Sequence, residues 1–296
     1  MKDYIYELKF VLGKDARGLA EMLHSALVGQ GFRETDIIED ESERTIKVSV
    51  FLPSSGKAQA TRGRVKALKL GRFRSYIKKL RRGDWVDKWK KGLKPFRITK
   101  DLTVVPLRYK QKKLSRDARK IHLDMTMAFG SGLHPTTRSV ASFLGKFSGK
   151  YGSFLDVGTG TGILAIVASR YGAGRIWALD IEEEAVSTAK NNFEMNGVNV
   201  ELAETADIKK FRKKEKFDFV AANLITDVLI ENRGKILSFV RDGGYLAVSG
   251  ISLNNLKRFR RSFDSRGLKC LRVTKEKDWA GILYRYLSQG CKQKPV

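Results

Sequence analysis

A glycine turn between two strand-like runs constrains the fold of this chain more than any other feature. Residues 153–157 lead into Gly158-Thr-Gly-Thr-Gly162, an apolar helix-like run follows, and a second strand-like run ends in Asp180. A strand, a tight glycine turn, a helix and a second strand form a unit that binds nucleoside cofactors beyond the carboxyl ends of a parallel sheet. The sequence therefore predicts an α/β sheet with a ligand site at this turn.

The spacing of the three glycines separates two classes of cofactor. They give G-x-G-x-G, whereas the dinucleotide pattern G-x-G-x-x-G requires glycine at the position of Ile163. This spacing disfavours NAD. Asp156 before the turn and Asp180 after the second strand suit S-adenosylmethionine instead, because that cofactor offers carboxylates an ammonium group and a ribose diol.

The composition indicates a globular protein with one large or two modest cores, since 42% of the 296 residues are hydrophobic. The two cysteines, Cys270 and Cys291, are too few for a disulfide framework and lack neighbours in a metal-binding spacing. The first ten residues alternate polar and apolar side chains and lack the apolar core of a signal peptide. We therefore expect a cytoplasmic location, no membrane span and no bound metal.

The net charge of +26 is concentrated in one part of the chain. Residues 57–120 contain 24 Lys or Arg and four Asp, which gives +20, whereas residues 1–56 carry −3. An ion-paired surface would raise glutamate together with lysine, and this segment contains no glutamate. Clustered cations of this kind contact phosphate groups, so a contact with RNA and a solvated basic face both stay open.

The hydrophobic pattern predicts a small α+β domain followed by a connector. Alternating polar and apolar residues predict strands at 4–12, 32–39 and 44–51. Residues 14–29 have helical spacing, and apolar residues from 55 to 80 recur every three to four positions, which predicts a second helix. The predicted parts are a first domain at 1–82, a basic connector at 83–120 and a ligand-binding domain at 121–296.

After residue 150 strands and helices alternate, which predicts a parallel sheet. The predicted strands are 153–157, 175–180, 198–203, 217–222, 245–250, 268–274 and 279–286. The predicted helices are 162–171, 182–195, 227–240 and 253–265. Because a short polar link joins the last two strands, we expect a seven-stranded, doubly wound sheet with an antiparallel edge strand.

Residues that follow the strands are candidates for ligand contacts, because the carboxyl ends of parallel strands meet at one edge of the sheet. Gly158 and Gly160 let the backbone approach a cofactor without a Cβ clash. Asp180 can accept hydrogen bonds from both ribose hydroxyls. Asp207, after the third strand, is either a contact to an adenine amino group or a turn residue.

Asn223, which follows the strand 217–222, is the candidate catalytic residue. Its amide oxygen can accept from an amine N–H and so direct the nitrogen lone pair at a methyl group, although an amide is not a base. The amine must be neutral, which apolar groups such as Phe129 and Leu224 would favour. Asn223 as a simple cap of the next helix is the alternative.

Residues 128–137 form a glycine-containing segment that leads into a helix, as a loop over a ligand would. Thr137 either caps that helix or hydrogen-bonds the cofactor. His134 is either a catalytic base or a residue that fixes the loop. The spacing alone decides neither pair of alternatives.

The motifs together resemble the bacterial methyltransferase family PrmA over nearly the whole chain. The similar segments are Ala128-Phe-Gly-Ser-Gly-Leu-His-Pro-Thr-Thr137, Leu155-Asp-Val-Gly-Thr-Gly-Thr-Gly-Ile-Leu-Ala165, Leu179-Asp-Ile181, Ala222-Asn-Leu-Ile225, Asp84-Trp-Val-Asp-Lys-Trp-Lys-Lys91, Lys94-Pro-Phe-Arg-Ile98 and Asp278-Trp279. The family usually has Thr at the position of Ser131 and Asn-Ile-Leu-Ala where this chain has Asn223-Leu-Ile-Thr226.

The resemblance implies a class I, Rossmann-like methyltransferase domain that uses S-adenosyl-L-methionine, joined to a small N-terminal α+β (ferredoxin-like) recognition domain. It implies methylation of lysine and/or N-terminal amines of protein eleven of the large ribosomal subunit. Carried over by position, it assigns Thr137, Gly158, Asp180 and Asn223 to the cofactor, with Asn223 also at the amine.

Two other functions stay open at this point. The charge favours an RNA methyltransferase, but no cysteine lies near Asn223 and the Pro-Pro-aromatic motif that stacks a flipped base is missing from the sequence. An adaptor that binds the cofactor without turnover would also fit the lack of a general base. Contact of the basic segment 57–120 with ribosomal RNA is a separate hypothesis.

Overall fold

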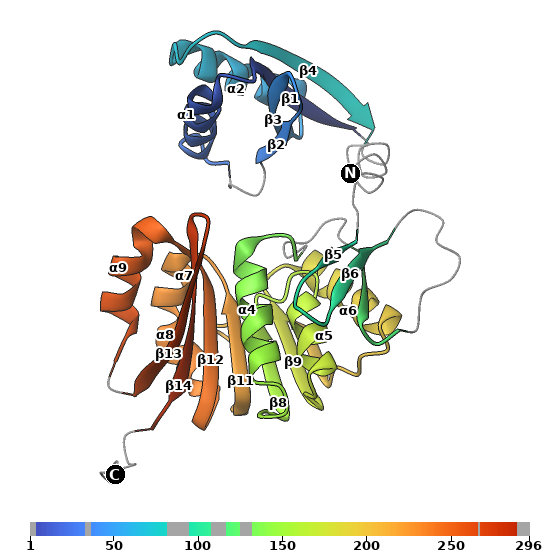
Figure 1. Ribbon diagram of the computed structural model, residues 1–296, viewed down its shortest axis with the longest axis vertical. Helices are drawn as coiled ribbons and strands as arrows, with labels where there is room; N and C mark the ends of the chain where they lie inside the picture. The colour runs from blue at the N-terminus through green and yellow to red at the C-terminus, as the bar shows by residue number, and fades with distance from the viewer. Residues whose placement is uncertain are drawn as a thin grey trace. The chain divides into compact units, whose positions relative to one another are not determined.

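The computed structural model describes residues 4–32, 37–81, 95–107, 117–124, 132–265 and 267–288. The chain divides into two compact units, Met1–Lys91 and Gly92–Val296 (Figure 1). The boundary between the units therefore lies inside the segment that the sequence assigns to a connector. No helix in the described ranges is long and apolar enough to cross a membrane.

The first unit is a four-stranded antiparallel sheet with two helices. Its elements are β1 (Tyr4–Gly13), α1 (Arg17–Val28), β2 (Ile37–Glu41), β3 (Thr45–Leu52), α2 (Ser55–Ala67) and β4 (Arg74–Arg81). The strand order is β2-β3-β1-β4. Inward-facing residues of the strands, such as Leu8 and Val48, form one core with Leu23 of α1 and Ala58 of α2. This βαββαβ arrangement is the predicted ferredoxin-like fold.

The predicted helix from 55 to 80 is wrong in its second half. Helix α2 ends at Ala67, and Lys69 adopts a left-handed backbone (φ 48°) that stops a helix. Residues 74–81 form strand β4, in which Ile77 lies opposite Leu8 of β1. The apolar spacing suited a helix, but pairing with β1 satisfies the backbone of this segment and packs Ile77 against the core, while Tyr76 stays exposed.

The second unit begins with a small sheet of three strands. These strands are β5 (Phe96–Arg97), β6 (Thr103–Pro106) and β7 (Lys120–Leu123), in the order β5-β6-β7. Two asparagines bind the backbone at the end of β7: Asn192 lies in helix α6 (Glu183–Met195), and Asn196 is the C-cap of that helix. Asn196 exchanges hydrogen bonds with the backbone of His122, and Asn192 does so with the backbone of Asp124. Asn192 also donates to the carbonyl of Thr161 in the glycine turn, at 2.8 Å.

The main sheet of the second unit has seven strands in the order β10-β9-β8-β11-β12-β14-β13. Their bounds are β8 (Ser153–Val157), β9 (Arg175–Asp180), β10 (Leu202–Thr205), β11 (Phe217–Asn223), β12 (Val240–Ser252), β13 (Leu268–Glu276) and β14 (Trp279–Tyr286). The remaining helices are α4 (Pro135–Lys146), α5 (Ile163–Arg170), α7 (Thr226–Glu231), α8 (Arg233–Ser238) and α9 (Leu253–Phe263). The predicted seven-stranded α/β sheet is therefore confirmed.

Three details of this sheet differ from the sequence prediction. The antiparallel strand is not at the edge, because β14 lies between β12 and β13 and is antiparallel to both. The third strand is β10 at 202–205 rather than 198–203. The predicted helix 227–240 is two helices broken at Asn232, whose side-chain amide donates to the carbonyl of Val228 at 2.8 Å.

The helices of the second unit form two groups. Helix α4 contacts α5, and α5 contacts α6, whereas α9 and α8 each contact α7. Figure 1 shows α4 standing in front of the strands. Leu155, Val220 and Val248 belong to the core that contains residues of α7, α8 and α9. Because side chains alternate along a strand, Asp156 and Asn223 point to the face that carries α4.

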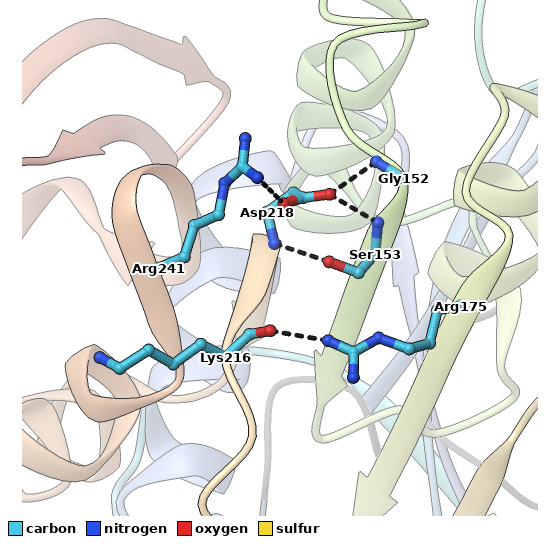
Figure 2. A network of polar contacts seen from close by, with 6 residues as sticks. All are labelled: Gly152, Ser153, Arg175, Lys216, Asp218 and Arg241. Carbon is cyan, nitrogen blue, oxygen red and sulfur yellow. Dashed lines mark hydrogen bonds and ion pairs between the residues drawn. The ribbon is translucent and has the colours of Figure 1, made fainter.

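An ionic network joins the strands at the amino ends (Figure 2). The Asp218 carboxylate of β11 accepts from the backbone N–H groups of Gly152 and Ser153 at 2.7 and 2.9 Å, and pairs with Arg241 at 2.7 Å. Burial by itself raises the pKa of Asp218, but these donors and Arg241 outweigh it and lower the pKa. Arg175 of β9 donates to the carbonyl of Lys216 at 2.8 Å. The network fixes the strands at the end opposite the predicted ligand site.

Candidate active site

The glycine turn lies at the carboxyl end of β8, where the order of the strands reverses between β9 and β11. All three glycines of the turn have a left-handed backbone, with φ of 76°, 54° and 78° at Gly158, Gly160 and Gly162. A Cβ on Gly158 would lie 2.4 Å from a methyl group of Leu224, and one on Gly162 would lie 2.5 Å from the ring of Phe193. The backbone conformation therefore favours glycine at all three positions, and the Phe193 ring adds a limit of space at Gly162.

Asp180 shapes the turn in addition to its predicted role. One carboxylate oxygen accepts from the N–H of Gly160 at 2.8 Å, and the other accepts from the N–H of Glu182 at 3.1 Å. Each oxygen keeps a second acceptor site, since a carboxylate accepts about four hydrogen bonds. The side chain is part-exposed, so a ribose diol can still reach it. The contact with Gly160 was not predicted from the sequence.

Asp156 is fully buried beneath the turn. One of its oxygens accepts from the Thr159 hydroxyl at 2.9 Å, and the other, Oδ1, has no hydrogen-bond partner among the described residues. Burial raises the pKa of Asp156 from the ordinary 3.8 to about 7; the negative charge of Asp180 adds to this, and the Thr159 hydroxyl and the Ala165 backbone only partly offset it. A carboxyl group enclosed in this way does not favour the expected direct contact with an ammonium group.

Asn223 and Thr137 come together from distant parts of the sequence. The Asn223 side-chain amide at the end of β11 donates to the Thr137 hydroxyl of α4 at 3.4 Å. Thr137 is fully buried and Asn223 is 7% exposed. The amide oxygen of Asn223 is buried and has no hydrogen-bond partner in the described part of the chain. An amide held by its nitrogen thus presents an unused acceptor at the carboxyl edge.

Neither Asn223 nor Thr137 is a helix cap. The N-cap of α7 is Ile225, and no side chain caps that helix, so Asn223 is not a cap. The N-cap of α4 is His134, whose Nδ1 accepts from the N–H of Thr136 at 3.4 Å and lies 2.7 Å from the Thr136 hydroxyl. Thr137 is therefore not the cap of α4.

His134 fixes the start of α4. Its ring lies against Trp279 in an edge-on contact, with 5.0 Å between the ring centroids. Burial, followed by the positive charges of Arg138 and Lys277, lowers the pKa of His134. A neutral imidazole suits the acceptor role of Nδ1, so the structure favours the loop-fixing role over that of a base.

Other predicted residues take structural roles or lie outside the described ranges. The Asp207 carboxylate accepts from the N–H of Lys209 at 2.9 Å, which is the turn contact that the sequence analysis left open beside an adenine contact. Phe129, Ser131 and the rest of residues 125–131 lie outside the described residues, as does the connector motif at 84–91. Among the described residues no group of three or more His, Cys, Asp or Glu could hold a metal ion.

Exposed apolar side chains surround the carboxyl edge, which the sequence analysis did not identify. Ile181 after β9 is 70% exposed, Ile225 after β11 is 67% exposed, and Leu133 before α4 is 43% exposed. Each of these apolar residues lies within three positions of a polar candidate residue in the sequence. This proximity could have identified them. Apolar groups beside unused acceptors suit a ligand with an aromatic base and an alkyl amine.

The site as a whole fits S-adenosyl-L-methionine. Gly158 and Gly160 let a ligand approach the backbone, Asp180 retains acceptor sites for a diol, and the amide oxygen of Asn223 lacks a partner among the described residues. The groups that the described residues place here are a glycine backbone, a carboxylate and an amide, which suit binding and orientation of a ligand.

Comparison with known proteins gives a consistent result. The sequence profile of the family described as Ribosomal protein L11 methyltransferase (PrmA) matches residues 10–286 of this chain. The Ribosomal protein L11 methyltransferase of Geobacter metallireducens is 38% identical over 208 residues, which are 70% of this chain and 67% of that protein. The protein of the same name from Streptococcus thermophilus is 32% identical over 258 residues, which are 83% of this chain and 80% of that protein.

A solved structure shows the same likeness. The crystal structure of ribosomal protein L11 methylase from Lactobacillus delbrueckii subsp. bulgaricus is 26% identical in sequence, with a TM-score of 0.59. The match covers 66% of this chain and 100% of that chain. Sequence and fold therefore point to one family.

Proposed function

The chain belongs to the ribosomal protein L11 methyltransferase (PrmA) family, and we propose that it transfers methyl groups from S-adenosyl-L-methionine to lysine and/or N-terminal amines of ribosomal protein L11. The observation that carries the proposal is the Asn223–Thr137 pair at the carboxyl end of β11, which leaves one buried amide oxygen unused beside the glycine turn.

Five residues hold the cofactor in this proposal. Gly158 and Gly160 give its methionine part access to the backbone of the turn, and Asp180 accepts from the ribose hydroxyls. Thr137 and Asn223 border the reacting end from α4 and β11. When bound, the cofactor supplies a methyl group on a positively charged sulfur, which is open to attack by a neutral amine.

Asn223 positions the amine. Its free oxygen accepts one amine N–H, and the hydrogen bond from the amide nitrogen to the Thr137 hydroxyl holds the amide in place. A lysine amine has an ordinary pKa of about 10.4, and apolar surroundings favour its neutral form. The exposed Ile225 and the partly buried Leu224 supply such surroundings. The proton leaves to water, since no general base is needed once the amine is neutral.

Replacing Asn223 by alanine tests the mechanism. We expect Asn223→Ala to lower kcat by about a hundredfold, because the amine loses its orienting acceptor. The measurement is intact mass of purified ribosomal protein L11 over time with S-adenosyl-L-methionine, in which methyl groups appear one at a time. Unchanged turnover of the variant would remove Asn223 from the mechanism.

Replacing Asp180 tests the cofactor assignment. We expect Asp180→Ala to weaken cofactor binding at least tenfold, because the variant can neither accept from the ribose nor support Gly160. Asp180→Asn, which keeps one acceptor oxygen, is the matched variant and should bind with intermediate affinity. Calorimetry that shows equal affinity for the original protein and both variants would refute the ribose contact.

The RNA methyltransferase and the silent adaptor make different predictions in the same experiment. Label that appears in purified ribosomal RNA but not in the protein would support the RNA enzyme. Binding of S-adenosyl-L-methionine without transfer to any amine would support the adaptor. The named relatives and the amide-based site favour methylation of protein.

The proposal also covers the organisation of the chain. Residues 1–82 serve as the substrate-recognition domain, 83–120 as the basic connector and 121–296 as the methyltransferase domain. The basic stretch 57–120 contacts ribosomal RNA through its clustered cations. The protein acts in the cytoplasm, where its ribosomal substrate is found.

A further inference from the structure

The most basic described segment of the chain lies in the first unit. Residues 57–81 contain ten Lys or Arg and no Asp or Glu. They form α2, the turn that follows it and β4, which is an edge strand of the four-stranded sheet. Helices α1 and α2 pack on one face of that sheet, so β4 directs every second side chain to the face that these helices leave uncovered.

The alternation of β4 brings two cations and an aromatic ring to that face. Ile77 lies opposite Leu8 and packs against the core under the helices. Arg74, Tyr76, Lys78 and Leu80 have the opposite parity and therefore point away from the helices; the first three are exposed, and Leu80 is partly buried. The Tyr76 side chain is 52% exposed, so its ring is accessible to a planar ligand from solvent.

A groove of about 680 Å³ adjoins this face. Lys66 from α2, Lys69 and Arg72 from the turn, and Arg74 from β4 line it. None of these four cations pairs with a carboxylate of the described residues. Because Arg74 belongs to both the groove and the uncovered face of the sheet, the two form one continuous basic surface.

The carboxylate of β1 that lies beside β4 is already neutralised. Glu7 lies opposite Lys78 in the register of β1 and β4. Its carboxylate pairs with Lys9 at 2.8 Å and accepts from the Ser49 hydroxyl at 3.0 Å. The field over Arg74, Tyr76 and Lys78 therefore stays positive.

We propose that this surface binds single-stranded RNA, with phosphates in the groove of Lys66, Lys69, Arg72 and Arg74 and an unpaired base stacked on Tyr76. Unpaired cations hold a phosphate backbone, and an exposed ring on an open sheet stacks bases without reading their sequence. The inference rests on the proposed contact with ribosomal RNA and on no other part of the proposed function.

Two simpler roles account for only part of this surface. Lys and Arg on an edge strand prevent sheets from pairing edge to edge, but that role needs neither the exposed ring nor the cations of the groove. An acidic peptide would satisfy the cations, but it has no planar base for Tyr76. RNA uses all of the features.

The test measures binding of the full chain to a short fluorescein-labelled oligouridine by fluorescence anisotropy, over a series of KCl concentrations. Removing one cation that binds a phosphate should reduce the slope of log affinity against log salt by about 0.7. We therefore expect Arg72→Ala/Arg74→Ala to bind more weakly and with a shallower slope. Tyr76→Ala should weaken binding by about tenfold or more, whereas Tyr76→Phe should bind as the original protein does.

A charge-matched variant is the control. Lys257 and Arg261 of α9 are exposed and make no ion pair with a described residue, so Lys257→Ala/Arg261→Ala removes the same two charges from the second unit. We expect this control to keep the slope of the original protein. Tyr76→Ala should still bind S-adenosyl-L-methionine in calorimetry with the affinity of the original protein, because the cofactor site lies in the second unit; this separates the inference from the cofactor site.

Three outcomes would overturn the proposal. Equal loss of binding in both double variants would mean that net charge alone attracts RNA. Tighter binding of duplex than of single-stranded RNA would exclude stacking on Tyr76. No RNA binding, together with capture of a polyglutamate peptide or loss of L11 methylation in Tyr76→Ala, would assign the surface to a protein partner.

Discussion

At the scale of single residues, the site depends on buried oxygen atoms whose partners are not all supplied by the chain. Asp156 and Asn223 each keep one such oxygen, on neighbouring strands at the carboxyl edge. A buried acceptor without a partner costs about 1–3 kcal/mol. This cost is removed at Asn223 when a hydrogen-bond donor of the ligand binds its oxygen. At Asp156 protonation removes part of the cost, because the neutral carboxyl group is less costly to bury.

The protonation of Asp156 predicts how stability changes with pH. Burial raises its folded pKa above the ordinary 3.8, to about 7. Below pH 3.8 the Asp156 carboxyl group is protonated in both the folded and the unfolded protein. Above that pH the unfolded chain loses this proton first. The contribution of Asp156 to stability therefore falls until the pH exceeds the folded pKa. Between about pH 5 and about pH 7 the loss should be on the order of 2 kcal/mol.

The measurement is urea denaturation of the original protein and of Asp156→Asn across this range. Asparagine resembles the protonated acid and does not titrate, so the variant should gain in stability relative to the original protein as pH rises. A difference that stays constant with pH would show that Asp156 is ionised in the folded state.

At the scale of elements, the sequence pattern predicts the conformation of the glycine turn but not that of strand β4. The conformation of the turn is local, because three closely spaced glycines each have a positive φ; only its support by Asp180, 20 positions on, comes from another strand. Strand β4 is not local. Its apolar residues suit a helix or a strand, and the choice depends on the open edge of β1, to which it pairs over eight residues.

The glycine turn makes a testable prediction about close packing. Gly162→Ala should destabilise the protein by more than Gly149→Ala, although both positions have a similar left-handed φ of 78° and 73°. The backbone strain of about 1–2 kcal/mol is common to both. Only at Gly162 would the new Cβ meet an aromatic ring, at 2.5 Å from Phe193, whereas Gly149 has nothing within 4 Å.

Urea denaturation of the two variants gives the comparison directly. Overpacking typically adds about 1–3 kcal/mol to the cost at Gly162. Equal losses of stability in the two variants would mean that Phe193 moves aside and that space does not select glycine there.

At the scale of the whole molecule, the formal net charge of +26 dominates the electrostatics. Twelve ion pairs are resolved among the described residues, and in half of them both side chains are exposed. Exposed pairs contribute little each. Repulsion among the excess cations therefore outweighs them and destabilises the compact state.

Added salt should consequently stabilise the protein. Raising KCl from about 20 to about 200 mM shortens the Debye length from over 20 Å to under 10 Å. We expect Tm to rise by roughly 2–4 °C, the equivalent of about 1 kcal/mol for a protein of this size. A Tm that falls with salt in differential scanning fluorimetry would mean that the ion pairs dominate instead.

The sequence by itself determined the features that depend on short segments. The glycine spacing, the acid at the end of β9, the alternation of strands and helices and the Asn223 position all follow from neighbouring residues, because local backbone preference and burial periodicity act over a few positions. The family followed from these motifs as well, and the comparisons confirm it.

Only the tertiary structure decided the features that depend on distant partners. Strand pairing placed β14 between β12 and β13 and turned residues 74–81 into an edge strand. The packing of α4 on the sheet brought Thr137 to Asn223, 86 positions away in the sequence, and the fold of the second unit buried Asp156. No local pattern encodes these contacts, because each depends on which other segment occupies the neighbouring space.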